Sequence, residues 1–400
     1  MQTNLKSNNR NHALEILVPF LGVFAPYKIA VIPVTAVMLF TIVLFRNKGG
    51  IFISKQTMPY LFFVLYRVFR DVVHMFFSVS DPIDVQVKRL GEYIVLNALI
   101  IIMCNYDFDE RILFKWWKIA GTVFGAGMVY HIVQLLVFHQ SIQPISFVPG
   151  YIIYNEAVED FTRPTSFFSE PAAYVVSMLP LLFLSLKRRN IKWAVIATFL
   201  IMMSTSTIGV VLSALLWVLF ILFEKKSMKT TVVSLAFVCV FVVLFMKLPL
   251  FSDTLEKLQE VYVGESTWGS RVKGPFEMIS VMKWYELPFG TNILDTREFV
   301  FQNLSSFKSG AVPVLYVNYG YTVFLNTIAM LIYRYGIMGL GLFLLTFKNK
   351  LLNKRYEARM YAIMMLVAAF AQGSVASPDI GFIIVLLYAN KKRRQNSSVR

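Results

Sequence analysis

The chain has 400 residues, of which 57% are hydrophobic and 16% are charged, with a net charge of +16. A water-soluble domain is nearer half apolar and a quarter charged, so this composition argues against a soluble enzyme. The apolar residues form long runs and not the alternating pattern of an outer-membrane barrel, so we predict an all-α, polytopic membrane protein. The two cysteines, Cys104 and Cys239, lie in apolar runs and predict neither a disulfide framework nor a metal site.

Twelve apolar segments are candidate transmembrane helices, so we predict about twelve spans in a single membrane domain covering residues 1–400. The predicted spans are 13–27, 29–45, 58–79, 89–104, 112–138, 170–186, 191–207, 208–223, 231–247, 316–347, 358–373 and 377–390. Eleven or thirteen spans are alternatives, because the stretch 191–223 can be divided differently. The polar N-terminal residues are not followed by a small-residue cleavage site, so we expect no cleaved signal peptide.

Most basic residues lie in alternate connections between the predicted spans and in the two terminal segments. They are Lys6, Arg10, Arg46, Lys48, Lys55, Arg111, Lys115, Lys118, Lys187, Arg188, Arg189, Lys192, Lys225, Lys226, Lys229, Lys348, Lys350, Lys354, Arg355, Arg359, Lys391, Lys392, Arg393, Arg394 and Arg400. Cytoplasmic loops are enriched in Lys and Arg, so an even number of spans with both termini in the cytoplasm fits this distribution. Because the charge is spread over short separate loops, nucleic-acid binding is not expected.

Two long connections then fall on the outer side, at 139–169 and 248–315. Segment 252–263 begins with Ser and Asp, which are typical N-cap residues, and predicts a short helix. Segment 271–286 has apolar residues at helical spacing and predicts an amphipathic helix lying on the membrane. Long loops with structure of their own are usually functional. No internal repeat relates the two halves of the chain, which gives an inverted-repeat transporter no support.

The third predicted span carries a polar stripe of Arg67, Arg70, Asp71 and His74. Their spacing of three and four residues places them on one helix face. Charges at membrane depth are costly and usually face a cavity or a partner, so we favour a cationic wall that binds phosphate groups. The alternative is a structural stripe in which Arg67 pairs with Asp71. Arg334, in the tenth predicted span, is a weaker candidate because its long side chain can reach the membrane interface.

The first outer loop ends in the motif Arg163-Pro164-Thr165-Ser166-Phe167-Phe168-Ser169-Glu170-Pro171-Ala172-Ala173-Tyr174. The planar guanidinium of Arg163 suits phosphate. Pro171 is tolerated in the first turn of the helix expected to follow, and the negative charge of Glu170 is favoured at that helix N-terminus. The alternative is that Glu170 only starts the helix and that Arg163 is an interfacial anchor.

Other polar residues of the outer side are weaker candidates. His139 ends the fifth predicted span, where an interfacial histidine is the simpler interpretation. Glu156, Glu159 and Asp160 can contact sugars, although solvated carboxylates are the simpler interpretation. No phosphate-binding Gly-Lys-Ser/Thr loop, nucleophile elbow or zinc-binding His-Glu-x-x-His occurs. The Asp-x-Asp sequence Asp107-Phe108-Asp109 lies in an inner loop, and none occurs in an outer loop. A metal-dependent nucleotide-sugar transferase is therefore not expected.

The motif that ends at Tyr174 resembles the Arg-x-x-(Gly/Ser)-x-Phe-x-Glu-Pro-(Asn/Ala) signature of the O-antigen polymerase (Wzy) family and its O-antigen ligase relatives. The stretch 204–209, Ser-Thr-Ser-Thr-Ile-Gly, resembles the family's Ser/Thr-rich break between two mid-chain spans. Stretches 324–328, Phe-Leu-Asn-Thr-Ile, and 335–339, Tyr-Gly-Ile-Met-Gly, resemble its helix after the large outer loop. The order of these motifs and the loop lengths are similar over most of the chain.

This resemblance implies a metal-independent glycosyltransferase that joins undecaprenyl-pyrophosphate-linked oligosaccharides on the outer face of the cytoplasmic membrane. The product would be O-antigen, capsule or exopolysaccharide. Such chemistry needs cations for the pyrophosphate leaving group and a carboxylate or other base for the acceptor hydroxyl. By resemblance, Arg163 and Arg271 clamp the pyrophosphate and Glu170 orients the acceptor, so these three are the expected catalytic residues. The expected substrate-binding residues are Arg67, Arg70, His74, His139, Tyr319 and Tyr321.

The resemblance also implies partners, namely the lipid bilayer, the lipid-linked oligosaccharides, a chain-length regulator and a flippase, and it implies no cofactor. Relatives often carry a His-Asn pair where this chain has Asn318-Tyr319-Gly320-Tyr321. The missing histidine leaves the proton acceptor open and argues against a ligase. The other alternative is a flippase for the same lipid-linked units, which would share the spans and intramembrane arginines but would not need the long outer loop.

Overall fold

The described part of the chain is helical apart from one small ribbon. The computed structural model describes residues 12–24, 27–29, 32–46, 54–77, 82–106, 108–140, 144, 164–168, 170–223, 274–293, 295–307, 325–353 and 356–371. Strands β1 (Lys28–Ile29) and β2 (Ile32–Pro33) pair antiparallel, with Ile29 opposite Ile32. The prediction of a helical fold is therefore confirmed for these residues. Predicted spans 231–247 and 377–390 and the predicted helix 252–263 lie outside them.

The first predicted span, 13–27, is not one continuous helix. It consists of helix α1 (Ala13–Leu17) and one 3-10 turn, η1 (Val18–Phe20). Proline has no amide hydrogen and its ring collides with the carbonyl of the preceding helical turn, so Pro19 ends the α-helix. The second predicted span agrees better, because helix α2 (Val34–Arg46) covers most of it.

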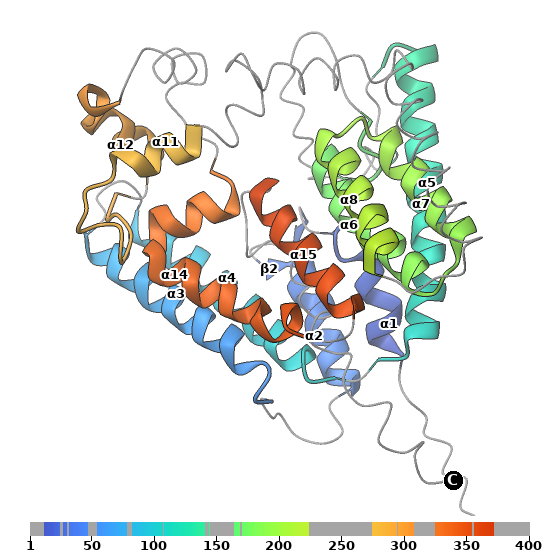
Figure 1. The fold of residues 1–400 in the computed structure, drawn as a ribbon, viewed down its shortest axis with the longest axis horizontal. Coiled ribbons are helices and arrows are strands. Elements are labelled where there is room, and N and C mark those ends of the chain that lie inside the picture. Colours follow the sequence, from blue (N-terminus) through green and yellow to red (C-terminus); the bar gives the residue numbers. More distant parts are fainter. Residues whose placement is uncertain are drawn as a thin grey trace, which may run out of the picture.

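Helices α3 (Met58–Phe77), α4 (Ile83–Met103) and α14 (Thr327–Leu351) form one flank of the molecule, on the left of Figure 1. The α3–α4 contact includes a buried hydrogen bond of 2.6 Å from the Tyr60 hydroxyl to Asn97 Oδ1. The α3–α14 contact includes the rings of Phe63 and Phe343, whose centroids are 5.5 Å apart. α14 therefore runs along α3 although more than 250 residues separate them in sequence.

Helices α5 (Glu110–Val137), α6 (Pro171–Lys187), α7 (Ile191–Met203) and α8 (Thr207–Phe223) form the opposite flank, on the right of Figure 1. Every residue of α6 from Ala172 to Leu186 is buried, so α6 is the core helix of this bundle. Helix α15 (Tyr356–Ala371) lies between the flanks, where the ring of Tyr361 packs 4.6 Å from that of Phe183.

A smaller unit packs against the first half of α14. It contains α11 (Gly274–Val281), α12 (Thr296–Gln302) and the 3-10 turn η5 (Leu304–Ser306). Its apolar centre is formed by Met278, Met282, Phe299 and Val300 around Tyr333 of α14. The amphipathic helix predicted over 271–286 is thus shorter than expected, because α11 ends at Val281 and turns follow.

Two of the described helices, α5 and α14, are long and apolar enough to cross a membrane by length and composition, and α14 contains a kink at Gly336. The apolar helices α2, α6, α7 and α8 are shorter, and the charges of α3 lower its hydropathy. The lengths of α5 and α14 therefore support a membrane protein, whereas the layout of twelve spans stays a prediction.

Candidate active site

Helix α14 is broken at Gly336, and another segment of the chain packs against the break. Gly336 has φ +69° and ψ −174°, so the helix consists of two halves that meet there. The Thr291 amide donates to the Tyr333 carbonyl (2.8 Å), and the Ile337 amide donates to the Leu287 carbonyl (2.8 Å). Buried backbone groups need hydrogen-bond partners, and this crossing segment, residues 287–291, supplies them to the broken helix.

Two glycines make this close approach possible. A Cβ atom on Gly336 would lie 2.2 Å from the Pro288 carbonyl oxygen, and one on Gly290 would lie 2.4 Å from the Arg334 carbonyl. Both residues also have positive φ, +69° and +90°, a conformation that glycine adopts without steric cost. Glycine is therefore required on each side of the crossing.

The polar stripe of α3 faces this junction. The Arg67 Nε donates to the Tyr335 hydroxyl at 2.8 Å, and that hydroxyl donates to Asp71 Oδ1, also at 2.8 Å. The Arg67 Nε lies 3.8 Å from Asp71 Oδ2, which is longer than a hydrogen bond. The expected Arg67–Asp71 pair exists, but the Tyr335 phenol bridges it. We call Arg67, Arg70, Asp71, His74 and Tyr335 the arginine cluster.

The other two α3 side chains of the cluster bind the crossing segment. The Arg70 Nη2 donates to the Gly290 carbonyl at 3.4 Å and lies 3.1 Å from His74 Nε2. His74 Nε2 is 3.0 Å from the Thr291 carbonyl, so it donates to that carbonyl in one tautomer and accepts from Arg70 in the other. Arg70 and His74 thus link α3 to the crossing segment.

Positive charge exceeds negative charge at this junction. The Arg67 guanidinium carbon lies 4.0 Å from the centre of the Tyr93 ring, a cation–π contact. Among the described residues, Arg67 Nη1, Arg70 Nε and Arg334 Nε are buried without a hydrogen-bond partner. The charge of Arg334 also acts on Asp71, so three guanidinium groups face one carboxylate. Buried charges are costly unless paired, so the arrangement suits an anion.

The described part of the Arg163–Tyr174 motif packs elsewhere, between α5 and α6. The Ser166 hydroxyl donates to the Phe124 carbonyl at 2.7 Å. The Phe168 ring makes edge-to-face contacts with the rings of Phe124 (5.1 Å) and Tyr174 (5.6 Å). This part of the motif therefore anchors the chain just before α6 in the apolar core.

The remaining predicted site residues do not join the arginine cluster in the described structure. Glu170 is exposed and precedes α6, which begins at Pro171 as expected, and its side chain makes no capping hydrogen bond. His139 is exposed just after α5 and has φ +51°. In Figure 1 both α5 and α6 lie on the flank opposite α3 and α14. The predicted residues outside the described ranges are Arg163, Arg271, Tyr319, Tyr321, Glu156, Glu159 and Asp160.

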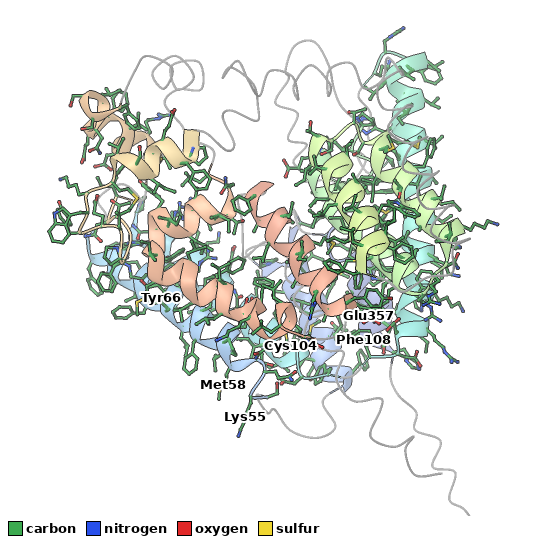
Figure 2. All side chains as sticks on the ribbon, viewed as in Figure 1. Lys55, Met58, Tyr66, Cys104, Phe108 and Glu357 are labelled. Carbon is green, nitrogen blue, oxygen red and sulfur yellow. The ribbon has the colours of Figure 1, made fainter. Side chains whose placement is uncertain are left out.

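The sequence interpretation missed Tyr335, Tyr93 and the crossing segment as parts of the site. Figure 2 labels Tyr66, whose hydroxyl donates to the Tyr335 carbonyl where α3 and α14 run side by side. A glycine directly after Tyr335 in an apolar helix was the available signal. Within the described ranges, no three His, Cys, Asp or Glu side chains gather in a way that could hold a metal ion.

Residues 139–393 match the family model of the WcaD colanic acid polymerase. No curated protein and no solved structure matches the chain. The matched region includes α14 and the crossing segment, whereas α3 precedes it, so the cluster joins residues from inside and outside the match. Because the match covers more than half of the chain, the protein belongs to the WcaD colanic acid polymerase family, and its resemblance to repeat-unit polymerases of the Wzy type is confirmed.

Proposed function

We propose that the protein is a membrane-bound glycosyltransferase that polymerises oligosaccharide repeat units carried on undecaprenyl pyrophosphate. The family match supports an exopolysaccharide of the colanic acid type as the product. The distribution of Lys and Arg supports a multi-pass protein of the cytoplasmic membrane with the reaction on the outer face.

The observation that carries this proposal is the surplus of buried positive charge in the arginine cluster. In the reaction, the acceptor hydroxyl oxygen bonds to the anomeric carbon of the donor sugar while the bond from that carbon to the pyrophosphate oxygen breaks. The pyrophosphate leaves with the electron pair, and the hydroxyl proton passes to a base. Guanidinium groups held in a site from which water is excluded stabilise the charge that develops on the leaving group. Arg67 has the buried Nη1 for this role.

The other predicted residues have roles by resemblance. Arg163 and Arg271 would complete the pyrophosphate clamp, and Glu170 would orient the acceptor. His139, Tyr319 and Tyr321 would contact the sugars. A chain-length regulator and a flippase would act with the protein, and neither a metal nor a cofactor would be needed.

A flippase and an O-antigen ligase are the competing functions. A flippase would also use cationic side chains for a lipid-linked pyrophosphate. The polymerase is favoured because the matching family is described as a polymerase. The missing histidine before residue 324 counts against the ligase.

Deletion of the gene separates these functions. A strain lacking a polymerase should present single repeat units on the outer face and no polymer on a gel of surface polysaccharide. Single units retained on the inner leaflet would overturn the proposal in favour of a flippase.

The Arg67→Ala variant tests the site itself. Losing a hydrogen bond to a charged group costs about 1.5–3 kcal/mol, so polymer formation should fall roughly 10- to 100-fold at normal protein level. Arg297→Ala is the matched control, because Arg297 is an exposed arginine of α12. Full polymer from Arg67→Ala would remove the cluster from the reaction.

A further inference from the structure

The Tyr335 hydroxyl occupies a central position in the arginine cluster. Tyr335 is 0% exposed, and it directly precedes the break in α14 at Gly336. Its oxygen accepts from Arg67 Nε and donates to Asp71 Oδ1, each at 2.8 Å. A phenol carries one hydrogen and acceptor lone pairs, so both bonds form at once.

These contacts fix the plane of the Arg67 guanidinium. The Tyr93 ring lies 4.0 Å from the guanidinium carbon, and the Tyr335 ring centre lies 5.3 Å from it. With Nε held by Tyr335, the buried Nη1 is left without a partner among the described residues. A guanidinium with a fixed plane binds an anion at a lower entropic cost than a mobile one.

The phenol also keeps Asp71 from forming a direct hydrogen bond with Arg67, although the two charges remain paired. Residues four apart on a helix readily form an ion pair, and this one is held at 3.8 Å between Arg67 Nε and Asp71 Oδ2, beyond hydrogen-bond distance. The hydroxyl between them accounts for this separation. Without the hydroxyl, the carboxylate could approach the guanidinium and compete with a bound anion.

We propose that Tyr335 is a positioning residue that orients Arg67 toward the pyrophosphate and separates it from Asp71. This inference rests on the proposed function, in which Arg67 binds that group. Tyr335 is itself held by the Tyr66 hydroxyl, which donates to the Tyr335 carbonyl at 2.9 Å. The Ile337 amide just beyond the break is bonded to the Leu287 carbonyl, so the outer loop sets the position of Tyr335.

The test measures the Kd of farnesyl pyrophosphate for the full-length protein in nanodiscs, with farnesol as the uncharged comparison. Tyr335→Phe should weaken binding of the pyrophosphate by about tenfold, as expected for a lost hydrogen bond beside a charged group. It should leave farnesol binding unchanged. Tyr60→Phe is the matched control, because Tyr60 is a buried α3 tyrosine whose hydroxyl binds Asn97 instead.

A second variant separates positioning from mere packing. Asp71→Asn in the Tyr335→Phe background should restore much of the affinity, because the competing carboxylate is removed. A structural role of Tyr335 would give no such rescue. In an Arg67→Ala background, Tyr335→Phe should have no further effect, since it acts through Arg67.

The outcomes separate the two proposals. If Arg67→Ala binds farnesyl pyrophosphate as tightly as the unchanged protein, the arginine cluster is not the pyrophosphate site and the proposed function loses its main support. If Arg67→Ala weakens binding while Tyr335→Phe does not, or weakens it equally with and without Arg67, the positioning role of Tyr335 is overturned.

Discussion

The α5–α6 contact and the α3–α14 junction differ in which polar groups they bury. Between α5 and α6, the Ser166 hydroxyl binds a backbone carbonyl and the Phe168 ring packs between two other rings. At the α3–α14 junction, guanidinium groups are buried beside a broken helix and the carboxylate of Asp71. Both regions contain stretches that resemble elements of the same family, yet among the described residues the buried guanidinium groups gather at the second.

This difference shows that a motif at the expected place in the sequence can serve packing or chemistry. Burying an aromatic ring stabilises the fold, whereas burying uncompensated charge destabilises it. Surplus charge is therefore the better indicator of a binding site. The following substitutions test whether the two regions have these separate roles, in order of the expected effect on stability.

Phe168→Ala should have the largest effect on stability. Removing a buried phenylalanine costs about 3–5 kcal/mol in the free energy of unfolding, and Phe168 is 1% exposed. Thermal unfolding in detergent measures the loss. The control is Phe199→Ala, because Phe199 of α7 is 61% exposed. Equal stability of the two variants would show that the motif does not anchor the loop in the core.

Gly336→Ala should have the next largest effect, and it acts at the junction. The alanine would be strained at φ +69° by about 1–3 kcal/mol and would collide with the Pro288 carbonyl, displacing the crossing segment. Binding of farnesyl pyrophosphate should be lost along with this stability. Gly341→Ala in the same helix is the control, since a Cβ there meets nothing within 4 Å. If both variants bind the probe normally, the crossing does not shape the site.

Glu170→Gln should have the smallest effect on stability. Its side chain is exposed and makes no capping hydrogen bond, so the free energy of unfolding should change by less than about 0.5 kcal/mol. Polymer formation should nevertheless fall if the carboxylate orients the acceptor, as proposed. Asp84→Asn, an exposed acid in the first turn of α4, is the comparison. Normal polymer from Glu170→Gln would leave the Arg163–Tyr174 motif with a packing role alone.

Helix boundaries and the polar stripe of α3 could be predicted from residues that are close together in the sequence. Helices α3, α5, α6 and α8 begin and end within a few residues of the predicted apolar segments. The stripe of α3 follows from helical spacing alone, and Pro171 begins α6 as its fixed φ favours. The break after α1 was missed, although Pro19 was a local signal for it.

The sequence by itself determined the helical class, the α3 stripe and the family, because periodicity, proline positions and motif order are local properties of the chain. Only the tertiary structure decided that the Tyr335 hydroxyl bridges Arg67 and Asp71, and that residues 287–291 hydrogen-bond to α14 on both sides of Gly336. The Tyr335 bridge joins residues more than 200 positions apart. The geometry at Gly336 depends on two backbones that approach closely enough to exclude a Cβ atom. Such an approach is a property of packed segments, and no spacing within either segment encodes it.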